Sequence, residues 1–236
     1  KLETEKIDLS NWNDLIIKQK NIAIKNERVK IAIVGKYIAM KDAYISLIEA
    51  LNHGGIYNDI NVDIKWISAE TLENDKDIEN YFKDINGLII PGGFGERGIE
   101  GKIEAIKYAR ENKIPYLGIC LGMQLMCVEF ARNILSYKEA NTIEVNENAK
   151  YPIITLMEEQ KKNILKGGTM RLGAFPCEIK EESLSYKLYK NKIISERHRH
   201  RYEFNNEYIN DMEKNGLIIT GKLQNGELVE IVEVKN

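Results

Sequence analysis

The sequence has few cysteines and few histidines. Its 236 residues include three of each. Cys120, Cys127 and Cys177 are too few and too irregularly spaced for a disulfide framework or a zinc site. We therefore expect free thiols, a reducing cytoplasmic location and no metal site.

Long apolar runs and an excess of one charge are also missing. No apolar stretch approaches the roughly 20 residues of a membrane span, and no charged-then-apolar leader opens the chain. Lys and Arg number 34 against 36 Asp and Glu, which leaves a net charge of −2. Such a balance gives no general attraction for nucleic acid or for an anionic membrane. With 43% hydrophobic and 30% charged residues, the composition is that of a globular domain.

What the chain does contain is a polar arm followed by alternating strands and helices. Residues 1–28 are rich in Lys and Asn and are interpreted as a linker or arm, and a domain is expected over 29–236. Hydrophobic runs predict strands over 29–34, 62–66, 87–91 and 114–119. Helices are predicted from a cap at Asp42 to a stop at His53-Gly54-Gly55, and over 76–83, 100–112 and 121–132. This alternation predicts an α/β fold, with a mostly parallel sheet between helices and with function at the carboxyl ends of the strands.

The second half has a weaker pattern. A long polar segment spans 136–170 and shows no clear period. Asn225-Gly226 lies between apolar runs at 217–223 and 227–234, which predicts a C-terminal β-hairpin.

The motif Gly118-Ile-Cys120-Leu-Gly122 lies between a predicted strand and a predicted helix. It is the cysteine form of a nucleophile elbow, in which glycines two residues away relieve a crowded turn. The helix N-terminus is expected to lower the pKa of the Cys120 thiol, and the Leu121 N–H is expected to face a developing oxyanion. Cys127 and Cys177 are interpreted as small buried hydrophobic residues.

A glycine loop, Pro91-Gly-Gly-Phe-Gly95-Glu-Arg-Gly98, follows the preceding strand. It fits the G-x-G-x-x-G pattern, but a dinucleotide site also needs an acidic residue at the end of the next strand, where Cys120 stands instead. We therefore interpret the loop as the other half of an oxyanion hole, with the Gly93 N–H facing Cys120.

Together these motifs resemble the class I, triad-type glutamine amidotransferases. More closely, the chain is similar to the glutaminase domain of CTP synthases. The additional motifs that carry this resemblance are Gly35-Lys-Tyr, Asp42-Ala-Tyr, Glu49-Ala-Leu-Asn-His-Gly-Gly55, Gly168-Thr-Met-Arg-Leu-Gly173 and Glu196-Arg-His-Arg-His-Arg-Tyr-Glu203. The resemblance runs from about residue 29 to the end, and it implies a flavodoxin-like sheet.

The resemblance also implies site residues. Cys120 attacks the side-chain amide of L-glutamine, forms a thioester and releases ammonia, while Gly93 and Leu121 form the oxyanion hole. Gly122, Met123 and Gln124 help to seat the substrate. Glu144 holds its α-amino group and Arg201 its α-carboxylate.

The resemblance implies partners as well. An N-terminal synthetase domain would use the ammonia, ATP and Mg²⁺ to aminate UTP, within a homotetramer. GTP would activate the enzyme, and Arg97 would contact this effector. No cofactor is expected in the glutaminase domain itself, and no P-loop motif occurs in this sequence.

The family's general base is a histidine in a His-Pro-Glu motif near the C-terminus, and no such motif occurs in these 236 residues. The histidines are His53, His198 and His200. We expect His53 to be structural and the strand of His200 to serve substrate binding, so neither is predicted to replace the base. The expectation is that the parent chain continues past Asn236 and that the sequence as printed is poorly active. The alternatives are the glutaminase domain of another class I amidotransferase and an inactive glutamine-binding module.

Overall fold

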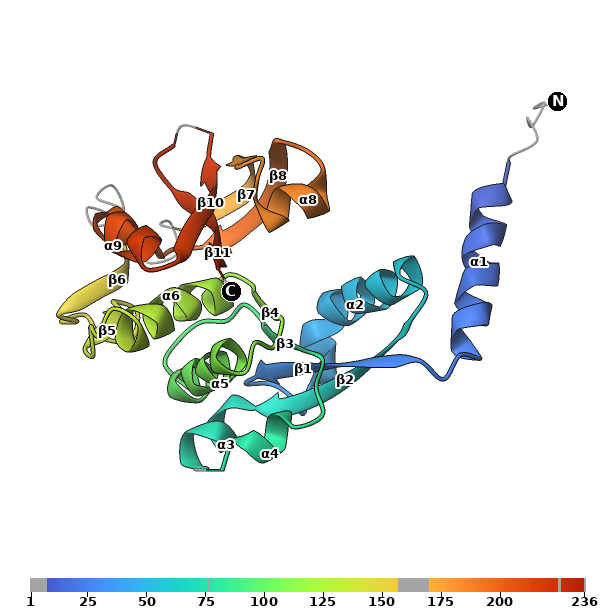
Figure 1. The fold of residues 1–236 in the computed structure, drawn as a ribbon, viewed down its shortest axis with the longest axis horizontal. Coiled ribbons are helices and arrows are strands. Elements are labelled where there is room, and N and C mark those ends of the chain that lie inside the picture. Colours follow the sequence, from blue (N-terminus) through green and yellow to red (C-terminus); the bar gives the residue numbers. More distant parts are fainter. Residues whose placement is uncertain (1–7, 76, 157–169, 225, 236) are drawn as a thin grey trace.

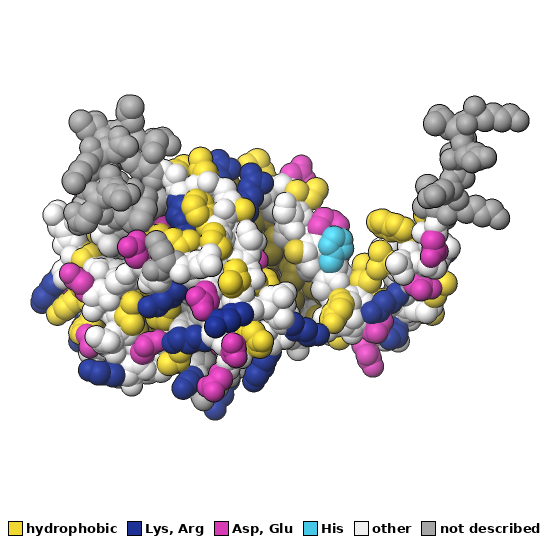
Figure 2. Space-filling model, turned by 90° about the horizontal axis from the view of Figure 1, so that it is seen from above, with side chains coloured by type: hydrophobic (Ala, Val, Ile, Leu, Met, Phe, Trp, Pro, Cys, Tyr) yellow, Lys and Arg dark blue, Asp and Glu magenta, His cyan; other side chains and the backbone are white. Residues whose placement is uncertain are grey.

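The computed structural model describes residues 8–75, 77–156, 170–224 and 226–235 (Figure 1). Over these ranges the helices are all too short or too polar to cross a membrane. Figure 2 shows Lys and Arg interspersed with Asp and Glu over one face of the molecule, as the balanced composition suggested.

A parallel sheet forms the first half of the domain. Its strands have the order β2-β1-β3-β4, and each neighbouring pair is parallel. Their bounds are β1 (Arg28–Gly35), β2 (Asn61–Ser68), β3 (Gly87–Ile90) and β4 (Tyr116–Gly118). All of β3 is buried, as is expected of a short apolar strand inside a covered parallel sheet. The four predicted strands are confirmed, although β4 is shorter than the 114–119 expected.

Helices cover this sheet, which confirms the predicted α/β class. Figure 1 shows α2 on one side of the sheet and α3 and α4 on the other. Helix α5 packs against both α3 and α6, with Ile103 and Ile106 buried. The helices of this half are η1 (Lys41–Tyr44), α2 (Ile45–Tyr57), α3 (Ala69–Asn74), α4 (Glu79–Phe82), α5 (Ile99–Glu111) and α6 (Leu121–Asn133).

Two predicted helix boundaries are wrong. Asp42 lies inside η1 rather than capping α2, whose N-cap residue is Tyr44. Helix α2 does not stop at His53-Gly54-Gly55 but continues to Tyr57. A Cβ on Gly55 would lie 2.7 Å from the carbonyl oxygen of Ile60, so this buried glycine permits a close approach and does not end the helix. The helix predicted over 76–83 is shorter, and α3 precedes it.

The second half is built from two further sheets. One has the order β11-β10-β7-β8 and the other the order β5-β6-β9. The predicted hairpin is confirmed as the antiparallel pair β10–β11, although Asn225 lies outside the described residues. The elements are β5 (Ala140–Thr142), β6 (Tyr151–Thr155), β7 (Arg171–Ile179), α8 (Leu184–Tyr189), β8 (Ile193–His200), β9 (Glu203–Phe204), η3 (Asn206–Tyr208), α9 (Ile209–Lys214), β10 (Leu217–Leu223) and β11 (Val229–Val234).

The segment 136–170 is less irregular than the sequence suggested. It contains β5 and β6, which its polar composition concealed. Residues 157–169 lie outside the described structure, and they include the first two residues of the Gly168–Gly173 motif.

A helical arm precedes the domain. Helix α1 (Ser10–Ala23) stands apart from the body in Figures 1 and 2, and its Lys18 Nζ donates to the Tyr57 carbonyl at 2.9 Å. Trp12 is 64% exposed, whereas Ile22 is buried. The division between an arm over 1–28 and a domain over 29–236 stays a prediction.

One hydrophobic core joins the two halves. Ile90 of β3 and Leu125 of α6 belong to the same buried cluster as Ile153 of β6 and Val229 of β11. Helix α6, which begins at the predicted nucleophile, lies within this core with nine of its residues buried, Leu121 and Gln124 among them. The elbow is therefore placed where the parallel sheet meets the second half.

Candidate active site

Cys120 occupies the sharp turn between β4 and α6. Its backbone has φ 53° and ψ −105°, an uncommon conformation for a residue other than glycine. A Cβ on Gly118 would lie 2.5 Å from the carbonyl carbon of Gly122, and one on Gly122 would lie 2.2 Å from the Ile90 carbonyl oxygen. Glycine is thus sterically required on both sides of the turn, as the motif predicted.

Further hydrogen bonds hold this turn. The hydroxyl group of Tyr116 donates to the Gly122 carbonyl at 2.7 Å, and the Gln124 N–H donates to the Cys120 carbonyl at 3.1 Å. The Tyr116–Gly122 hydrogen bond joins β4 to the start of α6. The Gln124–Cys120 hydrogen bond closes the first turn of that helix. The strained conformation is therefore supported by packing and by hydrogen bonds together.

The environment of the Cys120 thiol differs from the prediction. Burial raises the pKa of this thiol above its usual value, and the nearby carboxylates of Glu144 and Glu203 raise it further. The Leu121 N–H hydrogen-bonds to the sulfur and acts in the opposite direction. The expected lowering by the helix N-terminus is thus outweighed by desolvation, and the resting thiol is protonated.

The other two cysteines are buried structural residues. Burial raises the pKa of both Cys127 and Cys177 to about 12. Cys127 lies inside the predicted helix, α6, and Cys177 lies in β7. Neither thiol is suited to nucleophilic chemistry, because the thiolate is the reactive form.

The glycine loop lies directly beside the elbow. A Cβ on Gly92 would be 3.5 Å from the Cys120 Cβ, and one on Gly93 would be 3.4 Å from Leu121 Cδ2. The pairing of Ile90 with Gly118 in β3 and β4 brings the two strand ends together. The loop and the elbow thus meet, as the oxyanion-hole interpretation requires.

Two charged side chains fix the far part of this loop. The Gly95 N–H donates to Glu144 Oε1 at 2.8 Å, and Lys36 Nζ donates to the Gly95 carbonyl at 3.2 Å. Gly95 has φ +74°, which favours glycine. Glu144 therefore lies at the site beside Cys120 with one oxygen already engaged by the backbone.

Gln124 links the elbow helix to the segment that carries Arg201. Its Nε2 donates to the Tyr202 carbonyl at 2.8 Å, and its side chain is buried. Arg201 is half-buried directly after β8. Gln124 thus holds the chain next to Arg201, and its part in seating the substrate stays a prediction.

Met123 and Arg97 also make contacts within the protein. Met123 Sδ accepts from Cys127 Sγ at 3.8 Å, one turn later in α6. Arg97 Nε lies 2.6 Å from Glu70 Oε1, and its guanidinium lies 5.4 Å from the Tyr37 ring centroid.

Three charged residues near the site were not assigned a part from the sequence. They are Lys36, Lys102 and Glu203, of which Lys102 and Glu203 are buried. Lys36 follows β1 directly, so its place at the carboxyl edge of the sheet was a usable signal. Lys102 and Glu203 gave none, because a single charged residue in a helix or strand is usually exposed.

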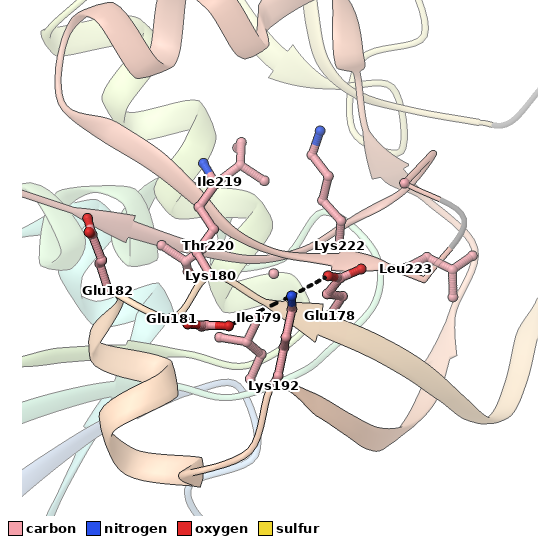
Figure 3. Close-up of a pocket in the computed structure, with 12 residues that line it drawn as sticks. Glu178, Ile179, Lys180, Glu181, Glu182, Lys192, Ile219, Thr220, Lys222 and Leu223 are labelled. Carbon is pink, nitrogen blue, oxygen red and sulfur yellow. Dashed lines mark ion pairs between the residues drawn. The ribbon is translucent and has the colours of Figure 1, made fainter.

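Two cavities lie away from Cys120. One cavity of about 530 Å³ is lined by residues of β7 and β10 and by Lys192 (Figure 3). Lys192 Nζ forms ion pairs there with Glu178 at 3.4 Å and Glu181 at 3.8 Å. A larger one, of about 820 Å³, lies between α5, β4 and β11. Neither contains a candidate catalytic residue.

Comparison with known proteins identifies the family of this chain. Residues 39–236 match the family described as Glutamine amidotransferase class-I. The chain is 55% identical over 230 residues to a CTP synthase of Clostridium beijerinckii and 51% identical over 229 residues to one of Caldanaerobacter subterraneus. These matches cover 98% and 97% of the chain but 42% of each relative, so the chain spans less than half their length.

A solved structure shows the same relationship. The glutaminase domain of Trypanosoma brucei CTP synthase, with bound acivicin, superposes with a TM-score of 0.80 at 37% identity. The match covers 87% of this chain and 81% of that one. The predicted fold is thereby confirmed, and the chain belongs to the class I glutamine amidotransferases, among the glutaminase domains of CTP synthases.

Proposed function

We propose that this domain hydrolyses the side-chain amide of L-glutamine through a thioester on Cys120 and supplies the ammonia for amination of UTP to CTP. The observation that carries the proposal is the strained Cys120 turn, with the Leu121 N–H directed at the sulfur and the Gly92-Gly93 loop beside it. This layout is what attack on a planar amide requires, because the nucleophile and the oxyanion donors must face one carbonyl group.

In the proposed reaction a base removes the thiol proton and the sulfur attacks the amide carbon. The N–H groups of Gly93 and Leu121 stabilise the tetrahedral oxyanion, which then expels ammonia after the nitrogen is protonated. Water hydrolyses the thioester, which yields glutamate and restores the thiol. The raised pKa of Cys120 makes the base essential for the first step.

We assign none of the described residues as that base. His198 lies 3.3 Å from Glu230 and His200 lies 3.4 Å from Glu203, so both are engaged elsewhere. His53 is exposed on α2.

Glu144 and Arg201 are proposed to hold the far end of glutamine, the ammonium group and the carboxylate respectively. Glu144 is close enough to raise the pKa of Cys120, which supports its place beside the reacting group. Gln124 supports Arg201 through the Tyr202 carbonyl. A zwitterionic substrate needs one anion and one cation at this end, and the two residues supply them.

Covalent labelling with acivicin, the compound bound in the trypanosomal relative, tests this proposal. Peptide mass spectrometry of the labelled 236-residue chain should place the adduct on Cys120, and excess glutamine should slow its formation. Cys127 and Cys177 serve as internal controls, because both are buried and should stay unmodified.

The outcomes separate the parts of the proposal. Labelling of Cys120 that glutamine does not slow would reject Glu144 and Arg201 as a glutamine clamp. Labelling that is equal on all three cysteines, or labelling of the full parent protein that is absent from Cys120, would reject Cys120 as the nucleophile.

The activity of a whole CTP synthase is a further part of the proposal. Since the relatives are more than twice as long, we propose a synthetase domain in the same parent chain that uses ATP and Mg²⁺, within a cytoplasmic homotetramer. This part is tested by measuring CTP formation in the full parent protein, with either glutamine or added ammonia as the nitrogen source. Cys120→Ala should abolish CTP formation from glutamine while CTP formation from added ammonia persists.

Arg97 is proposed as a contact for the activator GTP. Its side chain is 56% exposed within the glycine loop, which supports this placement, but its Nε is paired with Glu70. When GTP binds, it would therefore replace the Glu70 carboxylate as the anionic partner of the Arg97 guanidinium. Arg97→Lys keeps the charge and should still raise the GTP concentration needed for activation, because the planar fork is lost.

A further inference from the structure

A cluster of ionisable side chains lies between β7, β8, β9 and β11, and of its members Glu203 also acts on the Cys120 thiol. It consists of Arg171, His198, His200, Glu203 and Glu230. Their side chains are between 5% and 15% exposed. Charged groups are rarely buried at this density without a ligand or a structural purpose.

Three donor atoms of this cluster converge. His198 Nδ1 lies 3.1 Å from His200 Nε2 and 3.3 Å from Glu230 Oε2, and all three atoms lie within 4.8 Å of one another. Zinc ligands at about 2.0–2.2 Å in a tetrahedron lie roughly 3.3–3.5 Å apart. The two shorter separations are thus already close to those of a bound zinc ion.

Outer contacts orient these donors for a metal. His200 Nδ1 lies 3.1 Å from the Tyr202 carbonyl and 3.4 Å from Glu203 Oε1, so its proton is held on that nitrogen and the Nε2 lone pair faces the cluster. Arg171 Nη2 donates to Glu230 Oε1 at 2.6 Å, which leaves Oε2 for an ion. Hydrogen bonds of this kind to histidine and carboxylate ligands are usual around metal sites.

The cluster also leaves one acceptor oxygen without a hydrogen bond. The carboxyl groups of Glu203 and Glu230 face a single guanidinium, and in the described part of the chain Glu203 Oε1 accepts no hydrogen bond. Arg171 disfavours a cation, but its contact is with the opposite oxygen of Glu230.

We propose that His198, His200 and Glu230 bind one divalent ion of the zinc class, with water as the fourth ligand. His198 and His200 lie on β8 and Glu230 lies on β11, the two edge strands of the sheet β11-β10-β7-β8. The ion would therefore join strands that share no backbone hydrogen bonds. It would also fix the end of β8, directly before Arg201.

Equilibrium dialysis of the 236-residue chain against Zn²⁺ tests this site, with metal content measured by mass spectrometry. A Cys120→Ser background removes the reactive thiol as a competing ligand. We expect one zinc ion per chain in this background, at least tenfold weaker binding after His198→Gln or His200→Gln, and unchanged binding after His53→Gln, the exposed control on α2.

X-ray absorption at the zinc edge gives a second measurement that needs no histidine variant to fold. Scattering from two imidazoles and no sulfur is expected for the Cys120→Ser chain. Absence of bound zinc would overturn the proposal. So would zinc whose affinity is the same in the His198 and His200 variants, or a spectrum without imidazole scattering.

Discussion

The carbonyl oxygen of Ile90 lies against Gly122, so close that a Cβ on Gly122 would be 2.2 Å from it. The same oxygen accepts a hydrogen bond from the Ile119 N–H at 3.0 Å. The last residue of β3 therefore contacts the turn on both sides of Cys120. This carbonyl group is therefore one of the contacts that fix the geometry of the nucleophile.

Gly122→Ala is expected to displace α6 from the end of β3. We predict that alkylation of Cys120 by iodoacetamide slows at least tenfold and that the free energy of unfolding falls by about 1–3 kcal/mol. Gly54→Ala is the matched control, because a Cβ there meets nothing within 4 Å. The control should keep the alkylation rate, and an equal rate in the Gly122 variant would contradict the prediction.

Glu144→Gln separates charge from hydrogen bonding at the site. The amide oxygen of glutamine can still accept from the Gly95 N–H, so the loop should keep its place. Because the Glu144 carboxylate raises the pKa of Cys120, its removal should lower that pKa and speed alkylation by neutral iodoacetamide near pH 7. Protection by glutamine should weaken at least tenfold, since the ammonium group loses its partner.

Glu144→Ala serves as the comparison, because it removes the acceptor as well. It should weaken glutamine protection equally and also loosen the loop, seen as faster amide exchange at Gly95. Slower iodoacetamide labelling in the Gln variant would show that the carboxylate does not act on Cys120 through its charge.

The elbow could be predicted from the sequence because its causes are local. Gly118, Cys120 and Gly122 lie within five positions, and the apolar runs on either side fix a strand and a helix. Steric crowding at such a turn does not depend on distant residues. The motif alone was therefore sufficient to predict the geometry of the Cys120 turn.

The connections between the elbow and the second half could not be predicted in this way. The Gln124–Tyr202 hydrogen bond joins residues 78 positions apart, and the Gly95–Glu144 bond joins residues 49 apart. The direction of the Cys120 pKa shift also depends on burial by distant segments, which is why the expectation from the helix N-terminus alone was wrong. Gly55 failed as a helix stop for a similar reason, since packing against Ile60 outweighs its low helix propensity.

Glu203 should make the stability of the domain fall as the pH rises. Burial raises the pKa of this carboxyl group from 4.5 to about 8, so the folded state favours the protonated form. The favourable contribution is complete below the unfolded value near pH 4.5 and is lost as the pH approaches 8. With EDTA present, the free energy of unfolding of the Glu203→Gln variant should therefore rise, relative to that of wild type, by on the order of 2 kcal/mol from pH 5 to pH 9.

Urea unfolding at both pH values measures this difference. Glu207→Gln is the control, because Glu207 is exposed in η3 and should show no such trend. A constant difference between wild type and the Glu203 variant would mean that the carboxyl group keeps its ordinary pKa in the fold.

Lys102 should have the opposite dependence on pH. Burial, together with the neighbouring cations Lys36 and Arg97, lowers the pKa of its ammonium group from 10.5 to about 8. Below pH 8 both the folded and unfolded chains are protonated, so the full cost of burying the charge is present, and it disappears as the pH rises to 10.5. Lys102→Met should therefore stabilise the domain by about 1–3 kcal/mol at pH 7 and by much less at pH 10. Lys107→Met, on the more exposed side of α5, should change stability little at either pH. If the Lys102 variant were less stable than wild type at pH 7, the ammonium group would be contributing favourable contacts that outweigh its desolvation.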